Sequence, residues 1–255
     1  MTIAVGFYRG DGIVLAADTQ ETVLGFKKHQ PKIEIRPHVV YPGKQFAVFA
    51  GAGDGPLIDS LIEKLWNAMR GKPDIDQMVE AAEDELIKTF QRLVPSYHAE
   101  YMPEVQMLVG LWSPPGDLEL IAIDGPILTR HIISKSIGCG KVLSTYIENR
   151  LLPNKSGLDF AIPIAVYIVD QAKAHVDGVG GETHVVTMMH DGKLKTIPQF
   201  EVQPKTKQIE EIDNLARYIA AIAMNEELST EVVRAEISEC VNGIIETREK
   251  KGPKA

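Results

Sequence analysis

The chain has 255 residues, of which 44% are hydrophobic and 24% charged, and this composition is typical of one globular domain with a sizeable core. A formal net charge of -8 argues against nucleic-acid binding. No apolar run approaches the roughly 18 residues of a membrane span, and no charged start leads into an apolar signal segment, so we expect a soluble, cytoplasmic protein without a membrane partner. The 2 cysteines are too few for a disulfide framework.

The first half of the chain predicts short strands followed by two helices. Gly10-Asp11-Gly12 is a strong signal for a tight hairpin between the first two apolar runs. The apolar residues then recur with a helical period, and Gly71-Lys72-Pro73 ends the first helix. The predicted strands cover residues 7–8, 13–17, 32–36 and 46–51, and the predicted helices cover 57–69 and 75–93.

The second half repeats this order with strands, two helices and a final hairpin. The hairpin turns at Asp191-Gly192, and Pro114-Pro115-Gly116-Asp117 separates two of the strands. Two packed sheets with helices on both outer faces would require this order, so the pattern predicts an α+β fold. The predicted strands cover 105–112, 118–123, 127–133, 183–189 and 193–197, and the helices cover 141–152 and 158–175.

After Pro204 the chain is predicted to be helical again. Two apolar stripes are separated near Ser229, which we expect to cap the second helix of this region. We therefore predict one domain over residues 1–200 and a C-terminal helical extension over 205–250. The extension either packs on the domain or is used in assembly.

Thr2 is a candidate nucleophile because of its place in the chain. Removal of Met1 would leave a hydroxyl and a free α-amine on the same residue. The amine has an unperturbed pKa of roughly 7.7–8.0, which is close enough to neutrality for it to act as the base for its own hydroxyl.

Several motifs that follow Thr2 carry a family resemblance. They are Gly12-Ile13-Val14-Leu15-Ala16-Ala17-Asp18, Thr22, Pro31-Lys32-Ile33 and Phe49-Ala50-Gly51. With Thr2, they resemble the catalytic signature of proteasome β-type subunits, most of all the bacterial HslV-like ones, which are N-terminal-nucleophile (Ntn) hydrolases. The resemblance extends in outline over residues 1–198 and implies the family's four-layer αββα sandwich, followed by the C-terminal helical extension.

The resemblance implies roles for individual residues. The Thr2 hydroxyl would attack the peptide carbonyl, and Asp18 would form a buried pair with a lysine that tunes the amine. Lys32 matches that lysine best, although its interval from Asp18 is shorter than in the family, and Lys28 is the alternative. Gly51 would donate its backbone N–H to the oxyanion.

The remaining site residues include two departures from the family. Phe49 would lie in the wall of the pocket for the residue before the cleaved bond, and Asp177 matches a supporting aspartate. Cys139 and Gly180 stand where the family has serines that orient the amine. Because a thiol donates weakly and glycine has no side chain, this supporting network would be thinned.

Three functions are compatible with these residues. The first is a threonine-type endopeptidase in a self-compartmentalising, homo-oligomeric ring that acts on peptides or unfolded proteins. A separate AAA+ ATPase unfoldase would have to supply folded substrates, because the sequence has no Gly-x-x-x-x-Gly-Lys-Ser/Thr loop. The alternatives are a noncatalytic ring subunit or scaffold and an Ntn amidase acting on a small molecule. We expect no cofactor and no metal, since His184 and His190 make no zinc pattern.

Overall fold

The computed structural model describes two compact units of the chain. The units are Met1–Pro204 and Lys205–Ala255. The residues described are 2–23, 26–93, 103–153 and 156–249, without the side chains at 22–23, 26–27, 199, 205 and 244–249. Within these residues, no helix is both long and apolar enough to cross a membrane.

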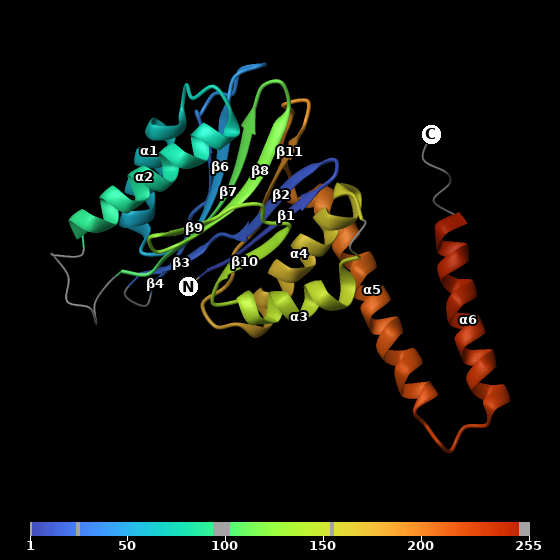
Figure 1. The fold of residues 1–255 in the computed structure, drawn as a ribbon. Coiled ribbons are helices and arrows are strands. Elements are labelled where there is room, and N and C mark those ends of the chain that lie inside the picture. Colours follow the sequence, from blue (N-terminus) through green and yellow to red (C-terminus); the bar gives the residue numbers. More distant parts are fainter. Residues whose placement is uncertain (1, 24–25, 94–102, 154–155, 250–255) are drawn as a thin grey trace. The chain divides into compact units, whose positions relative to one another are not determined.

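The N-terminal strand lies inside a five-stranded antiparallel sheet (Figure 1). The hairpin predicted at Gly10-Asp11-Gly12 joins β1 to β2, with Arg9 opposite Gly12. In spatial order the strands are β10 (Ser134–Gly138), β1 (Ile3–Arg9), β2 (Gly12–Asp18), β11 (Thr183–Met189) and β12 (Leu194–Ile197).

The middle of the chain forms a second five-stranded antiparallel sheet. The two sheets share one apolar cluster, to which Leu15 and Val186 contribute from the first sheet and Val48 and Leu108 from the second. The sheets therefore pack against each other through their inner faces. In spatial order the strands of the second sheet are β5 (Ile33–Arg36), β6 (Phe46–Gly53), β7 (Val105–Ser113), β8 (Asp117–Asp124) and β9 (Ile127–Thr129).

Two pairs of helices cover the other faces of the sheets (Figure 1). The helix α1 (Gly55–Met69) packs on β6 and β7 of the second sheet, and α2 (Ile75–Leu93) packs on β7 and β8. The helices α3 (Lys141–Leu151) and α4 (Leu158–His175) pack on β1 of the first. The prediction of an α+β fold is confirmed.

The start of α1 is fixed by its own sequence. The Asp54 carboxylate accepts a hydrogen bond of 2.9 Å from the N–H of Leu57, and Pro56 lies in the first turn. On the inner face of the helix, Leu61 and Leu65 are fully buried against the second sheet. This cap and this apolar face place the first turn of α1 beside the end of β6.

The strand predicted over 127–133 is wrong in its extent. β9 ends at Thr129, and the chain then leaves the second sheet and forms β10 in the first. His131 has a φ of 56°, and its backbone N–H donates to the buried carboxylate of Glu119 at 3.2 Å. This contact, between residues that are distant in the sequence, fixes the turn at which the chain passes from one sheet to the other. A local apolar pattern cannot predict such a turn.

Three further elements differ from the sequence prediction. β3 (Gln20–Val23) and β4 (Phe26–His29) form a separate two-stranded sheet that the pattern did not predict. The helix α5 (Gln199–Ala223) begins ahead of Pro204, which lies inside it.

The second helix of the C-terminal region follows the prediction. α6 (Thr230–Glu249) is capped by Ser229, whose hydroxyl oxygen accepts a hydrogen bond from the N–H of Val232 at 3.4 Å. The Tyr218 hydroxyl of α5 donates to the Glu236 carboxylate of α6 at 3.0 Å, so a polar contact joins the two helices.

The core beneath α1 gives a first prediction. Leu65→Ala removes a fully buried side chain, and we expect the free energy of unfolding to fall by about 3 kcal/mol because a cavity is left behind. Ile87→Ala on α2, where the side chain is 41% exposed, is the control and should change it by less than about 1 kcal/mol. Urea denaturation of both variants measures the difference, and equal effects would contradict the assigned packing.

Candidate active site

The Asp18 carboxylate is the best-connected polar group of the site. It lies at the end of β2, is fully buried and accepts four hydrogen bonds. Its Oδ1 accepts from the backbone N–H of Ile3 at 3.0 Å and from Nζ of Lys32 at 2.8 Å. Its Oδ2 accepts from the backbone N–H of Gln20 at 3.2 Å and of Gly180 at 3.1 Å. Hydrogen bonding on both oxygens makes burial of this charge tolerable.

Lys32 is the lysine that pairs with Asp18. Its side chain is 10% exposed, and burial lowers the pKa of its ammonium below the usual 10.5, against the opposing effect of the Asp18 charge. Lys28, the alternative, is 64% exposed and donates to Gln30 at 2.8 Å. Burial and the Asp18 charge thus act on the pKa of this ammonium in opposite directions, and Lys32 lines the same pocket as Thr2.

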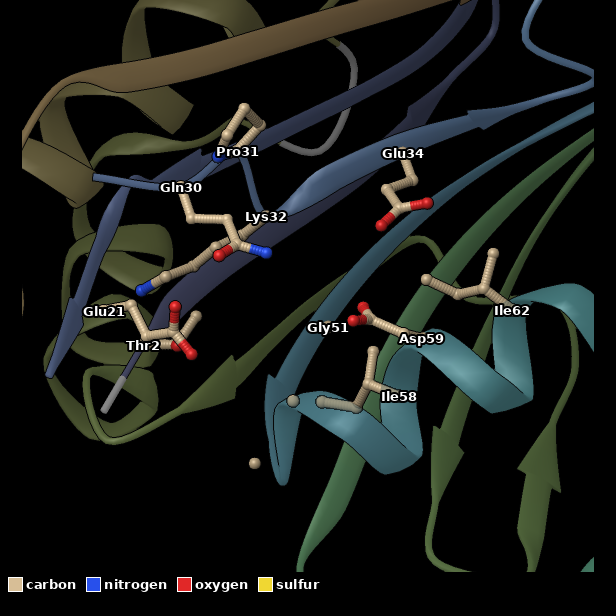
Figure 2. A pocket seen from close by; sticks show the side chains of 12 residues that line it. Thr2, Glu21, Gln30, Pro31, Lys32, Glu34, Gly51, Ile58, Asp59 and Ile62 are labelled. Atoms are coloured by element: carbon tan, nitrogen blue, oxygen red, sulfur yellow. The ribbon is translucent and has the colours of Figure 1, made fainter. Parts of the chain in front are cut away.

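Thr2 lies directly before β1 and is buried, with 7% of its surface exposed. Its carbonyl accepts hydrogen bonds from the backbone N–H of Cys139 at 2.9 Å and from Sγ of Cys139 at 3.3 Å. A Cβ on Gly138 would come within 2.0 Å of that carbonyl oxygen, so this approach requires glycine. Figure 2 shows the Lys32 side chain extending toward Thr2. Met1 and the side chain of Thr22 lie outside the described residues.

Gly51 lines the same pocket as Thr2, but its N–H is already engaged. This N–H donates to the backbone carbonyl of Lys32 at 3.3 Å, because the pairing of β5 with β6 brings the two segments together. An oxyanion at this position would therefore compete with a long hydrogen bond. A Cβ at Gly51 would lie 2.6 Å from Cγ2 of Ile58, which explains the absence of a side chain.

Phe49 does not lie in the pocket wall, so its predicted place is corrected. Its side chain is fully buried in the cluster between the second sheet and α1 and α2. Side chains two residues apart on a strand share a face, and α1 covers this face of β6. Ile58 and Ile62 of the helix supply the apolar part of the pocket instead.

Of the two residues predicted near position 180, Gly180 contacts Asp18 and Asp177 lies at the surface. Gly180 donates to Asp18, as described above, and its carbonyl accepts from the N–H of Gln20 at 3.0 Å. A Cβ at Gly180 would lie 2.4 Å from Oε1 of Gln20, so the Gln20 side chain occupies the space into which a serine would extend. Asp177 is exposed, and among the described residues its carboxylate makes no hydrogen bond or ion pair.

Thr2, Lys32 and Gly51 line a pocket of about 140 Å³ (Figure 2). The sequence interpretation named these three residues. Glu21, Glu34 and Asp59, which it did not name, line the pocket too. These three carboxylates come from separate segments and carry no motif. Over the part of the chain that the structure describes, no group of three or more His, Cys, Asp or Glu could hold a metal ion.

Solved structures with the same fold are known, although no protein-family model and no curated protein matches the sequence. A Gly-1 mutant of Anbu from Hyphomicrobium sp. strain MC1 is 16% identical, with a TM-score of 0.70 over 90% of this chain and 100% of that one. Anbu from Yersinia bercovieri, described as an ancestral beta-subunit, is 15% identical, with a TM-score of 0.67 over 89% and 99%. Anbu from Pseudomonas aeruginosa, seen in a helical assembly, is 14% identical, with a TM-score of 0.63 over 85% and 96%. The chain thus has the fold of the Anbu proteins.

The buried ion pair gives the second prediction. Asp18→Asn leaves the Lys32 ammonium buried without its counter-charge, and we expect the free energy of unfolding to fall by about 3–5 kcal/mol. The double variant Asp18→Asn/Lys32→Met should be more stable than Asp18→Asn, because the unpaired charge is gone. Urea denaturation measures both.

Lys28→Met is the matched control for this pair. Lys28 is exposed, so the substitution should change the free energy of unfolding by less than about 0.5 kcal/mol. A double variant that is less stable than Asp18→Asn would contradict the role of the unpaired ammonium.

Proposed function

We propose that this chain is a threonine-type peptidase of the proteasome-like Ntn hydrolases, with Thr2 as its nucleophile. The observation that carries the proposal is the buried Asp18–Lys32 pair, whose lysine lines the same pocket as Thr2. A buried ion pair needs no neighbouring hydroxyl for stability, whereas a nucleophile needs a nearby cation to lower the free energy of its alkoxide.

The proposed reaction begins once Met1 has been removed. The free amine of Thr2 takes the proton of the Thr2 hydroxyl, and the oxygen attacks the carbonyl carbon of the peptide. The carbon–nitrogen bond breaks, the leaving amine receives the proton, and an ester links Thr2 to the acyl half. Water, deprotonated by the same amine, hydrolyses the ester. Lys32 stabilises the alkoxide, and Asp18 holds Lys32 in place.

We propose the four-layer αββα sandwich for residues 1–200 and a role in packing or assembly for the extension over 205–250. The two sheets with helices on their outer faces support the sandwich. The Anbu neighbours, one described as an ancestral beta-subunit and one seen in a helical assembly, support a proteasome-related, homo-oligomeric assembly, which we propose to be a ring. We place this ring in the cytoplasm and expect a separate AAA+ unfoldase to supply folded substrates.

A noncatalytic ring subunit is the second candidate. It is favoured by Cys139 and Gly180 in place of two serines and by the N–H of Gly51, which already donates to Lys32. Such a subunit would keep the fold and the assembly without a reactive Thr2.

An intact-mass measurement with a peptide epoxyketone distinguishes the two candidates. This reagent needs both the hydroxyl and the free amine of an N-terminal threonine to close its ring adduct. We expect loss of Met1 and one adduct per chain, which Thr2→Ala abolishes together with peptide hydrolysis while assembly persists. Thr145→Ala removes an exposed hydroxyl on α3, so this control should react like the wild type.

Other results would change the assignment. A retained Met1, or a free Thr2 without an adduct, would favour the noncatalytic subunit. Peptide hydrolysis that persists in Thr2→Ala would contradict the mechanism. An adduct on Thr2 without hydrolysis of any peptide would favour an amidase that acts on a small molecule.

A further inference from the structure

We infer that the pocket beside Thr2 selects peptides with a basic residue, lysine or arginine, immediately before the cleaved bond. The inference rests on the proposed function and names its substrate class. It is carried by three carboxylates, those of Glu21, Glu34 and Asp59, which line this pocket. In Figure 2 the carboxylates of Glu34, from β5, and Asp59, from α1, both point into the space in front of Gly51.

The cations near the pocket do not balance these carboxylates. Lys32, the cation on the wall, is 2.8 Å from Asp18. Glu34 is 2.7 Å from Arg36, but Arg36 lies equally close to Glu63 and is shared between them. Within the described residues, the Asp59 carboxylate forms no hydrogen bond or ion pair.

The charge count around the pocket is therefore negative. Glu21 is 3.9 Å from Lys28, whose side chain is 64% exposed and mostly solvated. Five carboxylates face three side-chain cations, which leaves an excess of two negative charges, or of one while the free Thr2 amine of the proposed mechanism is protonated. The carboxylates belong to Asp18, Glu21, Glu34, Asp59 and Glu63, and the cations to Lys28, Lys32 and Arg36.

The apolar part of the pocket suits the rest of a basic side chain. Ile58 and Ile62 lie one helical turn apart on α1 and both line the pocket. A lysine or arginine can lay its aliphatic stem along these side chains while its charged head reaches the carboxylates. Asp59, next to Ile58 in the sequence, supplies a carboxylate at the same place.

Other side chains would fit this pocket less well. An apolar side chain would desolvate the carboxylates of Glu34 and Asp59 without offering them a partner. An acidic side chain would meet an excess of like charge. The pocket therefore both attracts a basic residue and disfavours its competitors.

The test compares peptide epoxyketones that differ only in the residue next to the reactive group. Lysine, norleucine and glutamate are used there, since norleucine keeps the lysine stem without the ammonium. The rate of adduct formation on Thr2 is followed by intact mass. We expect the lysine compound to react faster than the norleucine compound by on the order of tenfold, and the glutamate compound to be the slowest. Salt should reduce the ratio of lysine to norleucine, because charge causes it.

Two variants connect the preference to the pocket. Asp59→Asn removes the pocket carboxylate that has no partner among the described residues, and it should lower the ratio of lysine to norleucine by roughly threefold. Asp59→Lys should invert the ratio. Asp84→Asn removes an exposed carboxylate on α2 that is not on the pocket wall, so it should leave the ratio unchanged.

The outcomes separate this inference from the proposed function. An adduct on Thr2 that forms equally fast or faster with norleucine would overturn the basic preference and leave the peptidase in place. A ratio that Asp59→Asn does not change would overturn the assignment of the preference to this pocket. No adduct with any of the three compounds would overturn the proposed function and this inference with it.

Discussion

The structure around the site depends on one buried charge, the Asp18 carboxylate. A fully buried carboxylate must be paired and hydrogen-bonded, and its four donors come from the start of β1, from Gln20, from Lys32 and from Gly180. Segments that are far apart in the sequence are thereby held at one point. Because the N–H of Ile3 is one of these donors, the preceding residue, Thr2, is fixed beside the Lys32 ammonium. The position of the candidate nucleophile is thus a consequence of satisfying this carboxylate.

The polarity of the pocket follows from the alternation of side chains along β5 and the residue directly before it, Lys32. Lys32 and Glu34 both line the pocket, whereas Ile33 between them is buried in the cluster that the two sheets share. The opposite wall comes from the first turns of α1, which cover Phe49 and present Asp59. Lys32 pairs with Asp18, whereas the carboxylate of Glu34 lines the pocket. The two charges can therefore lie on one segment without neutralising each other.

Local patterns predicted much of the fold, and long-range contacts account for the rest. The helix over 75–93 was predicted to the residue, because its apolar period and its ends are local properties. The turn at His131 depends on a hydrogen bond to Glu119, and the burial of Phe49 depends on the helix that covers it. Neither feature could be predicted from the local sequence alone. The motif around Thr2 indicated one wall of the pocket. The three carboxylates that set its charge come from separate segments, and only the folded chain brings them together.

Cys139 and Gly180, which stand where the family resemblance implies serines, would affect the orientation of the Thr2 amine more than its position. The backbone N–H groups of Cys139 and Gly180 still donate to the Thr2 carbonyl and to Asp18, so the N-terminal strand keeps its anchors without either hydroxyl. Compared with the serines that the family resemblance implies, the site has fewer side-chain donors, and the Gln20 side chain fills the space at Gly180. Backbone donors hold the chain in place, but they cannot reorient toward the Thr2 amine, which gains and releases a proton in the proposed mechanism. In the proposed mechanism the replacements would therefore act on the rate of proton transfer, while the proposed binding of a basic side chain would depend on Glu34 and Asp59, which lie on other segments.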